Sequence, residues 1–391
     1  MISFEEALTI VSKAGKVLSA EQLPFLQSAR RILAEDIFSD INMPPFDKSA
    51  MDGFACKRVD LPGPLFILET IPAGQEPTLS VKQGQCSRIM TGSMLPNGAD
   101  CVIKVEETQL TTDGKVIFVA KETANNICYQ AEDVKKGQLV LKKGTLIKAA
   151  HIAVLASVGH TMPLVSRQVK AGILSTGDEL VEPEILPATS QIRNSNASQM
   201  ISQAKELGCE VQYYGIAPDE ENGLLALIQK AMAENDLILL SGGVSMGDYD
   251  LVPPMLQKAG FEILFNKISV MPGSPTLFAK TSNCYCFGLP GNPVSSFVQF
   301  EMLAKPLIYR LMGHEYKAVT AKLTLGTDYS RRKANRMSLV PVNIADNGEA
   351  IPLEYHGSAH IHAYIEANGM LIIPIGQFEL KKGEQADVRF L

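Results

Sequence analysis

The sequence predicts a multidomain protein that joins a doubly wound, mostly parallel α/β/α domain to β-rich regions. Three observations lead to this fold class. The chain has 391 residues, more than a single hydrophobic core accommodates. From Val169 onward, strand-like apolar runs alternate with helix-like runs, as in proteins with a parallel sheet. Residues 53–147 and 318–391 instead show short apolar runs separated by turn-forming dipeptides, which is typical of β-structure.

The N-terminal region begins with a predicted amphipathic helix over residues 3–16. Ser3 and Glu6 have the spacing of a capping box, and apolar residues follow at helical spacing. The segment 42–47 contains two consecutive prolines and breaks regular structure. Helical spacing returns at 149–157, after the β-like stretch, so we expect a discontinuous N-terminal domain that is interrupted by a β-rich insert.

The predicted α/β domain closes with a long apolar helix that begins at Pro293. This helix is expected to end at about Leu311, because the following Gly313 is a usual C-terminal stop. The residues after it carry the turn signals of a small β-barrel or sandwich. The expected domains are an N-terminal linker domain of residues 1–45 and 132–165, a β-rich insert of 46–131, an α/β domain of 166–315 and a C-terminal β-barrel of 316–391.

Composition narrows the classes of partner. With 36 basic and 42 acidic side chains, the net charge of −6 does not indicate the basic face that a nucleic-acid-binding protein needs. The longest apolar stretches, such as 370–375, are too short to span a membrane, and the first residues lack the basic start of a secretory signal. Seven scattered cysteines form no disulfide framework and fit a reducing compartment. We therefore expect a cytoplasmic protein that binds neither nucleic acid nor membrane.

Three glycine-rich loops follow predicted strands and are the first candidates for a binding site. They are residues 175–179, 241–247 and 288–293, and ligands of open α/β sheets bind beyond the carboxyl ends of the strands. Glycines let backbone N–H groups approach an anion, and the hydroxyls of these loops add donors. Each loop alone could equally be a tight turn. The chain has neither a P-loop nor a Gly-x-Gly-x-x-Gly loop after a strand, which disfavours an ATPase or a dehydrogenase.

Acidic residues gather at the same loops and suit a hard divalent cation such as Mg²⁺, held together with substrate phosphates. The residues concerned are Asp178, Glu179, Asp219, Glu220, Asp248 and Asp250. The alternative is that acids at helix starts complement the helix dipole, which fits Asp219 and Glu220 particularly well. The residues alone leave both interpretations open.

Two further clusters contain residues that can bind a metal ion. His356, His360 and His362 could converge on a metal, but no Cys or acid completes the set locally, so a polar loop between barrel strands is favoured. Cys284 and Cys286 would share one face of a strand, yet they lack a second cysteine pair. Core packing is the favoured interpretation for these thiols.

Five segments occur in a fixed order along the chain: Ser-Ala-Met-Asp-Gly-Phe at 49–54, Met-Thr-Gly at 90–92, Ser-Thr-Gly-Asp-Glu-Leu at 175–180, Ser-Gly-Gly-Val-Ser-Met-Gly-Asp-Tyr-Asp at 241–250 and Gly-Leu-Pro-Gly-Asn-Pro-Val-Ser at 288–295. Together they resemble the signatures of the MoeA family of molybdopterin molybdenumtransferases, which includes the gephyrin E domain. The resemblance covers nearly the whole chain. It implies an elongated subunit of four domains in a homodimer, with a third domain of the fold shared with the pterin adenylyltransferases (MogA-like).

The resemblance also implies a reaction. Members of the family take adenylylated molybdopterin and molybdate, hydrolyse the adenylate with a divalent cation such as Mg²⁺, release AMP and leave molybdenum on the dithiolene. It implies an active site between the second domain of one subunit and the third domain of the other. A molybdopterin adenylyltransferase and molybdoenzyme acceptors would be partners.

The resemblance assigns site residues by motif. The expected catalytic residues are Asp52, Asp133, Glu179, Asp219 and Asp250, and the expected metal ligands are Glu179, Asp248 and Asp250. The expected substrate-binding residues are Thr91, Ser175, Thr176, Gly177, Ser241, Gly242, Gly243, Ser245, Lys267, Pro290, Gly291, Asn292, Pro293 and Ser358.

Departures from the family pattern fall at basic positions. Met271 and Ser274 stand where the family has lysines, Cys128 stands at an anion-binding arginine, and Pro341 stands where another basic residue is common, while Arg336 matches a family arginine. Each lost charge-assisted donor would weaken anion binding by about 1.5 to 3 kcal/mol.

Two other functions are also compatible with parts of the sequence. One is a pterin-binding paralogue or scaffold without turnover, or with another specificity such as tungstate. The other is an amidase of the competence-damage type, which leaves the 49–54 segment and the C-terminal region unexplained.

Overall fold

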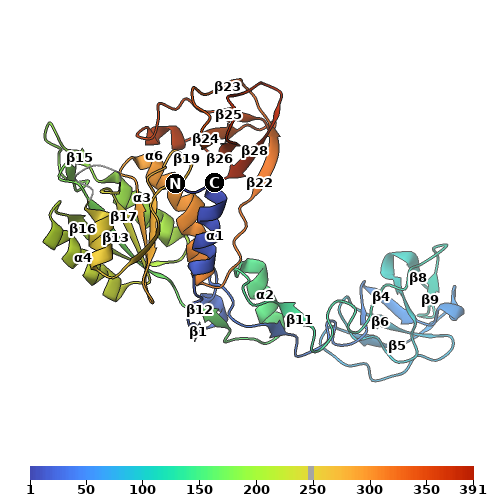
Figure 1. Cartoon of the computed structure of the whole chain (residues 1–391). Helices are drawn as coiled ribbons and strands as arrows, with labels where there is room; N and C mark the ends of the chain where they lie inside the picture. Colours follow the sequence, from blue (N-terminus) through green and yellow to red (C-terminus); the bar gives the residue numbers. More distant parts are fainter. Residues whose placement is uncertain (245–250) are drawn as a thin grey trace.

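The computed structural model describes residues 1–244 and 251–391 and shows an elongated chain (Figure 1). The α/β domain and the C-terminal barrel lie next to each other at one end, and a small linker body and then the β-rich insert extend from them (Figure 1). No helix in the described residues is long and apolar enough to cross a membrane. The predicted multidomain fold class is confirmed.

The first helix, α1 (Phe4–Ala14), forms as the sequence predicts. The backbone N–H of Glu6 donates to Ser3 Oγ at 3.1 Å, and the N–H of Ser3 donates to the Glu6 carboxylate at 2.8 Å, which completes the capping box. Its buried residues Ala7 and Val11 do not pack on the linker body. They belong to the large core of the α/β domain, where α1 contacts α7 (Lys305–Leu311).

The linker body is built from two stretches that are far apart in sequence. Strand β1 (Ala20–Gln22) pairs with β12 (Leu164–Ser166), and β2 (Ile37–Phe38) pairs with β11 (Leu139–Leu141). Helix α2 (Ala149–Ser157) packs its buried Leu155 with side chains from both stretches. The chain therefore leaves this body and returns to it after the insert.

The insert is a four-stranded sheet of order β5-β6-β4-β7 with smaller strand pairs around it. The strands are β3 (Lys48–Ser49), β4 (Gly53–Cys56), β5 (Phe66–Ile71), β6 (Gln85–Ile89), β7 (Cys101–Lys104), β8 (Thr108–Leu110), β9 (Val116–Phe118) and β10 (Ile127–Cys128). Strand β3 pairs with β10, and β8 pairs with β9. Cys56, Cys86 and Cys101 are buried in the core of the insert.

The α/β domain has a six-stranded sheet of order β16-β13-β17-β21-β20-β18, in which the first four strands are parallel. The strands are β13 (Lys170–Thr176), β16 (Glu210–Ala217), β17 (Leu237–Ser241), β18 (Glu262–Phe265), β20 (Leu277–Lys280) and β21 (Tyr285–Leu289). Strand β20 pairs antiparallel with both β21 and β18, so it alone opposes the other five strands of this sheet, and β18 forms the edge.

Both faces of this sheet are buried, as in a doubly wound fold. Alternate strand residues face two separate cores: Leu237 and Leu239 face one, and Ile238 and Leu240 face the other. The first core is covered by α3 (Ser195–Glu206), α6 (Pro293–Gln299) and α7, and the second by α4 (Glu221–Glu234) and α5 (Val252–Lys258). The thiols of Cys284 and Cys286 lie in the second core, so the prediction of core packing is confirmed.

The predicted helix from Pro293 to Leu311 is continuous but contains a π-helical turn at Phe300–Ala304, between α6 and α7. Pro306 has no backbone N–H, so the regular ladder cannot continue through it. The wider turn lies just before this proline and accommodates the break.

The C-terminal region is a small β-barrel. Its strands are β22 (Thr320–Thr324), β24 (Met337–Ile344), β25 (Ala350–Pro352), β26 (Gly369–Ile373) and β28 (Gln385–Phe390), with β23 (Tyr329–Ser330) paired to β27 (Glu379–Leu380). The order β25-β24-β26-β28-β22 is closed by a bridge between Leu325 and Ala350. Strand β19 (Val270–Met271) of the α/β domain adds to β24 and joins the two domains.

A buried arginine fastens the barrel to the α/β domain. Arg389 on β28 is 5% exposed, and its guanidinium donates to the Glu301 carbonyl at 2.6 Å and to the Tyr316 hydroxyl at 3.3 Å. The same group contacts Met302 Sδ at 3.0 Å. The last strand of the chain is thereby held on the π-helical turn.

Arg389→Met should lower the free energy of unfolding by about 2 kcal/mol, because the Glu301 carbonyl loses its donor inside the protein. Urea denaturation followed by circular dichroism measures the change. Arg332→Met, at an exposed position, is the matched control and should shift the transition by less than about 0.5 kcal/mol. Equal shifts for the two variants would contradict this role of Arg389.

Candidate functional site

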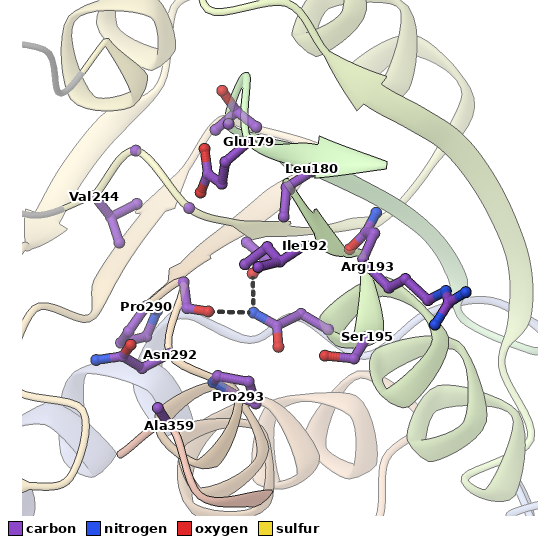
Figure 2. A pocket seen from close by; sticks show the side chains of 18 of the residues that line it. Glu179, Leu180, Ile192, Arg193, Ser195, Val244, Pro290, Asn292, Pro293 and Ala359 are labelled. Atoms are coloured by element: carbon purple, nitrogen blue, oxygen red, sulfur yellow. Dashed lines mark hydrogen bonds between the residues drawn. The ribbon is translucent and has the colours of Figure 1, made fainter. Parts of the chain in front are cut away.

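A cavity of about 730 Å³ lies beyond the carboxyl ends of β13, β17 and β21 (Figure 2). All three predicted glycine-rich loops contribute to its wall. The predicted site residues that line it are Thr176, Gly177, Glu179, Asp219, Ser241, Gly242, Gly243, Pro290, Gly291, Asn292 and Pro293. The topology therefore brings these residues together at one edge of the sheet, as expected for an open α/β fold.

The loops after β13 and β17 touch through their backbones. Gly242 has φ +95°, and a Cβ atom at this position would lie 2.3 Å from the Thr176 carbonyl oxygen. Gly177, at φ +145°, also has a backbone conformation that favours glycine, although the nearest atoms to a Cβ there would belong to the flexible Glu179 carboxylate, at 2.6 Å. Only glycine allows these conformations and contacts. Backbone groups thus form much of the cavity wall.

Two carboxylates line the cavity. Asp219 accepts a hydrogen bond from the Thr176 hydroxyl and, at 3.3 Å, from the backbone N–H of Asp178. Glu179 comes from the loop after β13 (Figure 2). Within residues 1–244 and 251–391, no three His, Cys, Asp or Glu side chains are placed to hold a metal ion. The predicted Asp248 and Asp250, together with Ser245, lie outside the described residues.

The start of α3 forms a wall that the sequence analysis did not predict. Asn194 caps the helix, accepting from the N–H of Ala197 at 3.3 Å and from the Ser175 hydroxyl at 3.1 Å. Its amide donates to the Tyr213 hydroxyl at 2.9 Å, and burial raises the pKa of Tyr213 above its usual range. Asn196 also lines the cavity. The sequence signal is the Asn-Ser-Asn triplet at 194–196, which forms the N-cap and the first two residues of α3 and usually indicates only capping.

Three predicted substrate-binding residues have other placements. Ser175 is fully buried behind the wall, where it bonds Asn194. Ser358 accepts from the Asn292 amide at 2.8 Å and so holds a barrel loop at the cavity, where Ala359 and Ile361 form part of the wall. Lys267 is not among the described residues that line the cavity.

The predicted site residues of the insert lie far from this cavity in the same chain (Figure 1). The backbone N–H and the hydroxyl of Thr91 both donate to Asp52 Oδ1 at 2.7 Å. These two bonds hold the pKa of Asp52 below its usual range. Asp133 is also exposed, at the junction of the insert and the linker body, and its N–H donates to the Met43 carbonyl at 3.0 Å.

None of the positions that depart from basic residues is among the described residues that line the cavity. Ser274 is buried and donates to the Ile268 carbonyl at 2.7 Å, whereas Met271 is 46% exposed. Pro341 lies buried in β24 of the barrel, and Cys128 is half-buried in the insert. Among the described lining residues, Arg193 is the one Lys or Arg side chain, against the acids Glu179 and Asp219.

Comparison with known families gives three consecutive matches. Residues 2–159 match the MoeA N-terminal region (domain I and II), residues 172–310 match a probable molybdopterin binding domain, and residues 322–391 match the MoeA C-terminal region (domain IV). The chain belongs to the MoeA family. Its members act in molybdenum cofactor biosynthesis, and this chain has a role in that process.

Individual relatives agree with this assignment. A molybdopterin molybdenumtransferase from Staphylococcus epidermidis is 34% identical over 99% of this chain and 95% of its own length. One from Staphylococcus aureus is 33% identical with the same coverage. A crystal structure of a MoeA protein from Pyrococcus horikoshii superposes with a TM-score of 0.86 at 27% identity, covering 100% of both chains. The MoeA architecture therefore extends along the whole chain.

The contact between the two glycine-rich loops can be tested by Gly242→Ala. The added methyl group should lower the free energy of unfolding by about 2 kcal/mol, because a positive φ and a backbone contact both oppose it. Gly291→Ala is the matched control, since a Cβ there would lie 3.8 Å from its nearest neighbour, an ordinary contact. Thermal and urea denaturation measure both variants. Equal stability of Gly242→Ala and the unmodified protein would contradict the geometry of the loops.

Proposed function

We propose that this chain is a molybdopterin molybdenumtransferase, which takes adenylylated molybdopterin and molybdate, releases AMP and leaves molybdenum on the dithiolene of the pterin. The observation that carries the proposal is the cavity, in which glycine-rich backbone, hydroxyls and two carboxylates meet at the carboxyl ends of three parallel strands. Curated relatives of the same length carry this name.

The wall of the cavity suits a substrate with phosphate groups. The Gly242 N–H already donates to the Leu289 carbonyl at 3.1 Å, so backbone donors for phosphate oxygens would come from neighbouring residues such as Gly243, which has no Cβ to block the approach of a ligand. The Thr176 side chain is turned toward Asp219, which keeps that carboxylate in place at the wall. Arg193 is the one Lys or Arg among the described residues that line the cavity. Backbone donors therefore take a larger share of the anion binding than in a lysine-rich site.

A divalent cation such as Mg²⁺ fits the carboxylates that line the cavity. Mg²⁺ commonly uses one or two protein carboxylates and completes its shell with water and substrate phosphates, so a full set of protein ligands is not required. Glu179 and Asp219 would hold it. When bound, the cation supplies neutralisation of the charge that develops as the phosphoanhydride breaks.

The enzyme is proposed to act as a homodimer. Asp52 and Thr91 lie in the insert, which is at the opposite end of the elongated molecule from the α/β domain that holds the cavity (Figure 1). If both groups act in one site, the cavity of one subunit must meet the insert of the other. A two-fold dimer would create two such sites at once.

The activity test is incubation of the purified chain with adenylylated molybdopterin, Mg²⁺ and molybdate, followed by measurement of AMP and of active cofactor. Glu179→Gln should lower AMP release on the order of 100-fold, because it removes the charge and keeps the shape. Glu221→Gln is the control, since Glu221 pairs with Lys258 on the surface. Tight binding of the substrate without AMP release by the unmodified chain would overturn the proposed function.

The shared site can be tested by mixing two inactive variants. Asp52→Asn and Glu179→Gln, refolded or expressed together, should regain about a quarter of the unmodified activity, because half of the random dimers contain one intact site. Each variant mixed with itself is the control and should stay inactive. Failure of the mixture to regain activity, although mixed dimers form, would contradict a site made by two subunits.

A further inference from the structure

We infer that Asn196 is the positioning residue that fixes the two loops after β17 and β21 at the spacing that the substrate needs. The inference rests on the proposed function and names a residue that no motif of the sequence singled out. Asn196 lies in the first turn of α3 and is 7% exposed. It therefore acts from within the wall of the cavity.

A single amide group joins both loops. Asn196 Nδ2 donates to Ser241 Oγ at 2.7 Å, at the last residue of β17, where the loop begins, and to the Gly291 carbonyl at 2.8 Å, in the loop after β21 (dashed lines in Figure 2). The N–H of Gly242, the residue after Ser241, also donates to the Leu289 carbonyl at 3.1 Å. The carboxyl ends of β17 and β21 are thus joined directly by backbone and also through the Asn196 amide.

The orientation of the amide follows from its partners. The Gly291 carbonyl can only accept, so the nitrogen of Asn196 must face it. The Asn196 carbonyl oxygen is then buried without a hydrogen-bond partner among the described residues. A buried oxygen without a partner is unfavourable, and an apolar side chain used only for packing would avoid it. The two hydrogen bonds from the Asn196 nitrogen to the loops offset this unfavourable free energy.

The clamp continues to the barrel. Asn292, the residue after Gly291, donates to Ser358 Oγ at 2.8 Å, and the Val294 N–H donates to the Ser358 carbonyl at 3.0 Å. Asn196 therefore sets the position of a loop that itself positions the barrel loop at the cavity. Small errors in such spacing reduce binding and catalysis because the donors no longer match the substrate.

The substitution Asn196→Asp should keep the hydrogen bond to Ser241 and remove the one to Gly291. A carboxylate has nearly the same shape, and the Ser241 hydroxyl can rotate and donate to it. The Gly291 carbonyl cannot donate and would face a negative oxygen. The variant should therefore release the loop after β21 while the core of the domain stays packed.

Asn235 offers a matched control. Its amide also joins a hydroxyl to a carbonyl, donating to Tyr214 at 2.6 Å and to Ala231 at 2.9 Å, and the residue is 8% exposed. It lies at the end of α4 and before β17, so it is at the other end of that strand from the cavity. Asn235→Asp removes the same kind of bond without touching the loops.

Two measurements on the full chain test the inference. In hydrogen exchange, peptides that contain Gly291 and Asn292 should exchange at least about tenfold faster in Asn196→Asp than in Asn235→Asp. In the AMP-release assay, Asn196→Asp should raise KM for adenylylated molybdopterin about tenfold relative to Asn235→Asp at a similar melting temperature. Equal exchange in the two variants would overturn the clamp. Faster exchange with equal KM would show that the clamp does not serve the substrate, and an inactive unmodified chain would instead refute the proposed function.

Discussion

The contact between the backbones of residues 176 and 242 is the constraint on which the site depends. Parallel strands β13 and β17 are neighbours, so their loops leave the same edge of the sheet side by side. At Gly242 the loops approach so closely that no side chain fits between them. The pairing of the two strand ends and this close backbone contact together place the Thr176–Glu179 segment and the Ser241–Gly243 segment in one wall of the cavity. A fold with the same residues on antiparallel strands would place these loops at opposite edges.

Charge at the cavity is arranged differently from a lysine-rich anion site. Arg193 is the one cationic side chain among the described lining residues, and Glu179 and Asp219 carry the opposite sign. In the proposed function, a phosphate-bearing substrate would therefore be held by backbone N–H groups and by a cation that the carboxylates attract. Binding to this surface should depend on the cation more strongly than binding to a site in which lysines neutralise the substrate.

Local sequence patterns predicted helices such as the first one and the long one after Pro293. The alternation of strand-like and helix-like runs predicted the fold class of the central α/β domain. Ser3 and Glu6 predicted a capping box, and the apolar run after Pro293 predicted the long helix. The packing of α1 on α7 was not predictable, because amphipathic periodicity shows that a helix has a buried face but does not name its partner. Asn196 was missed for a similar reason. Its partners, Ser241 and Gly291, are 45 and 95 residues away, and an Asn in the first turn of a helix looks like an ordinary cap.

The separation of the insert from the cavity links assembly to metal binding in the proposed enzyme. Thr91 donates two hydrogen bonds to Asp52 and lowers its pKa, so this exposed carboxylate remains ionised in mildly acidic solution. Docking it near Glu179 and Asp219 of another subunit would bring like charges together, which is unfavourable unless a cation lies between them. Cation and substrate would then bind most tightly to the assembled dimer, and by linkage they would stabilise that dimer. The linker body, which keeps Asp52 away from the acids of its own chain, fits a site that is completed only on assembly.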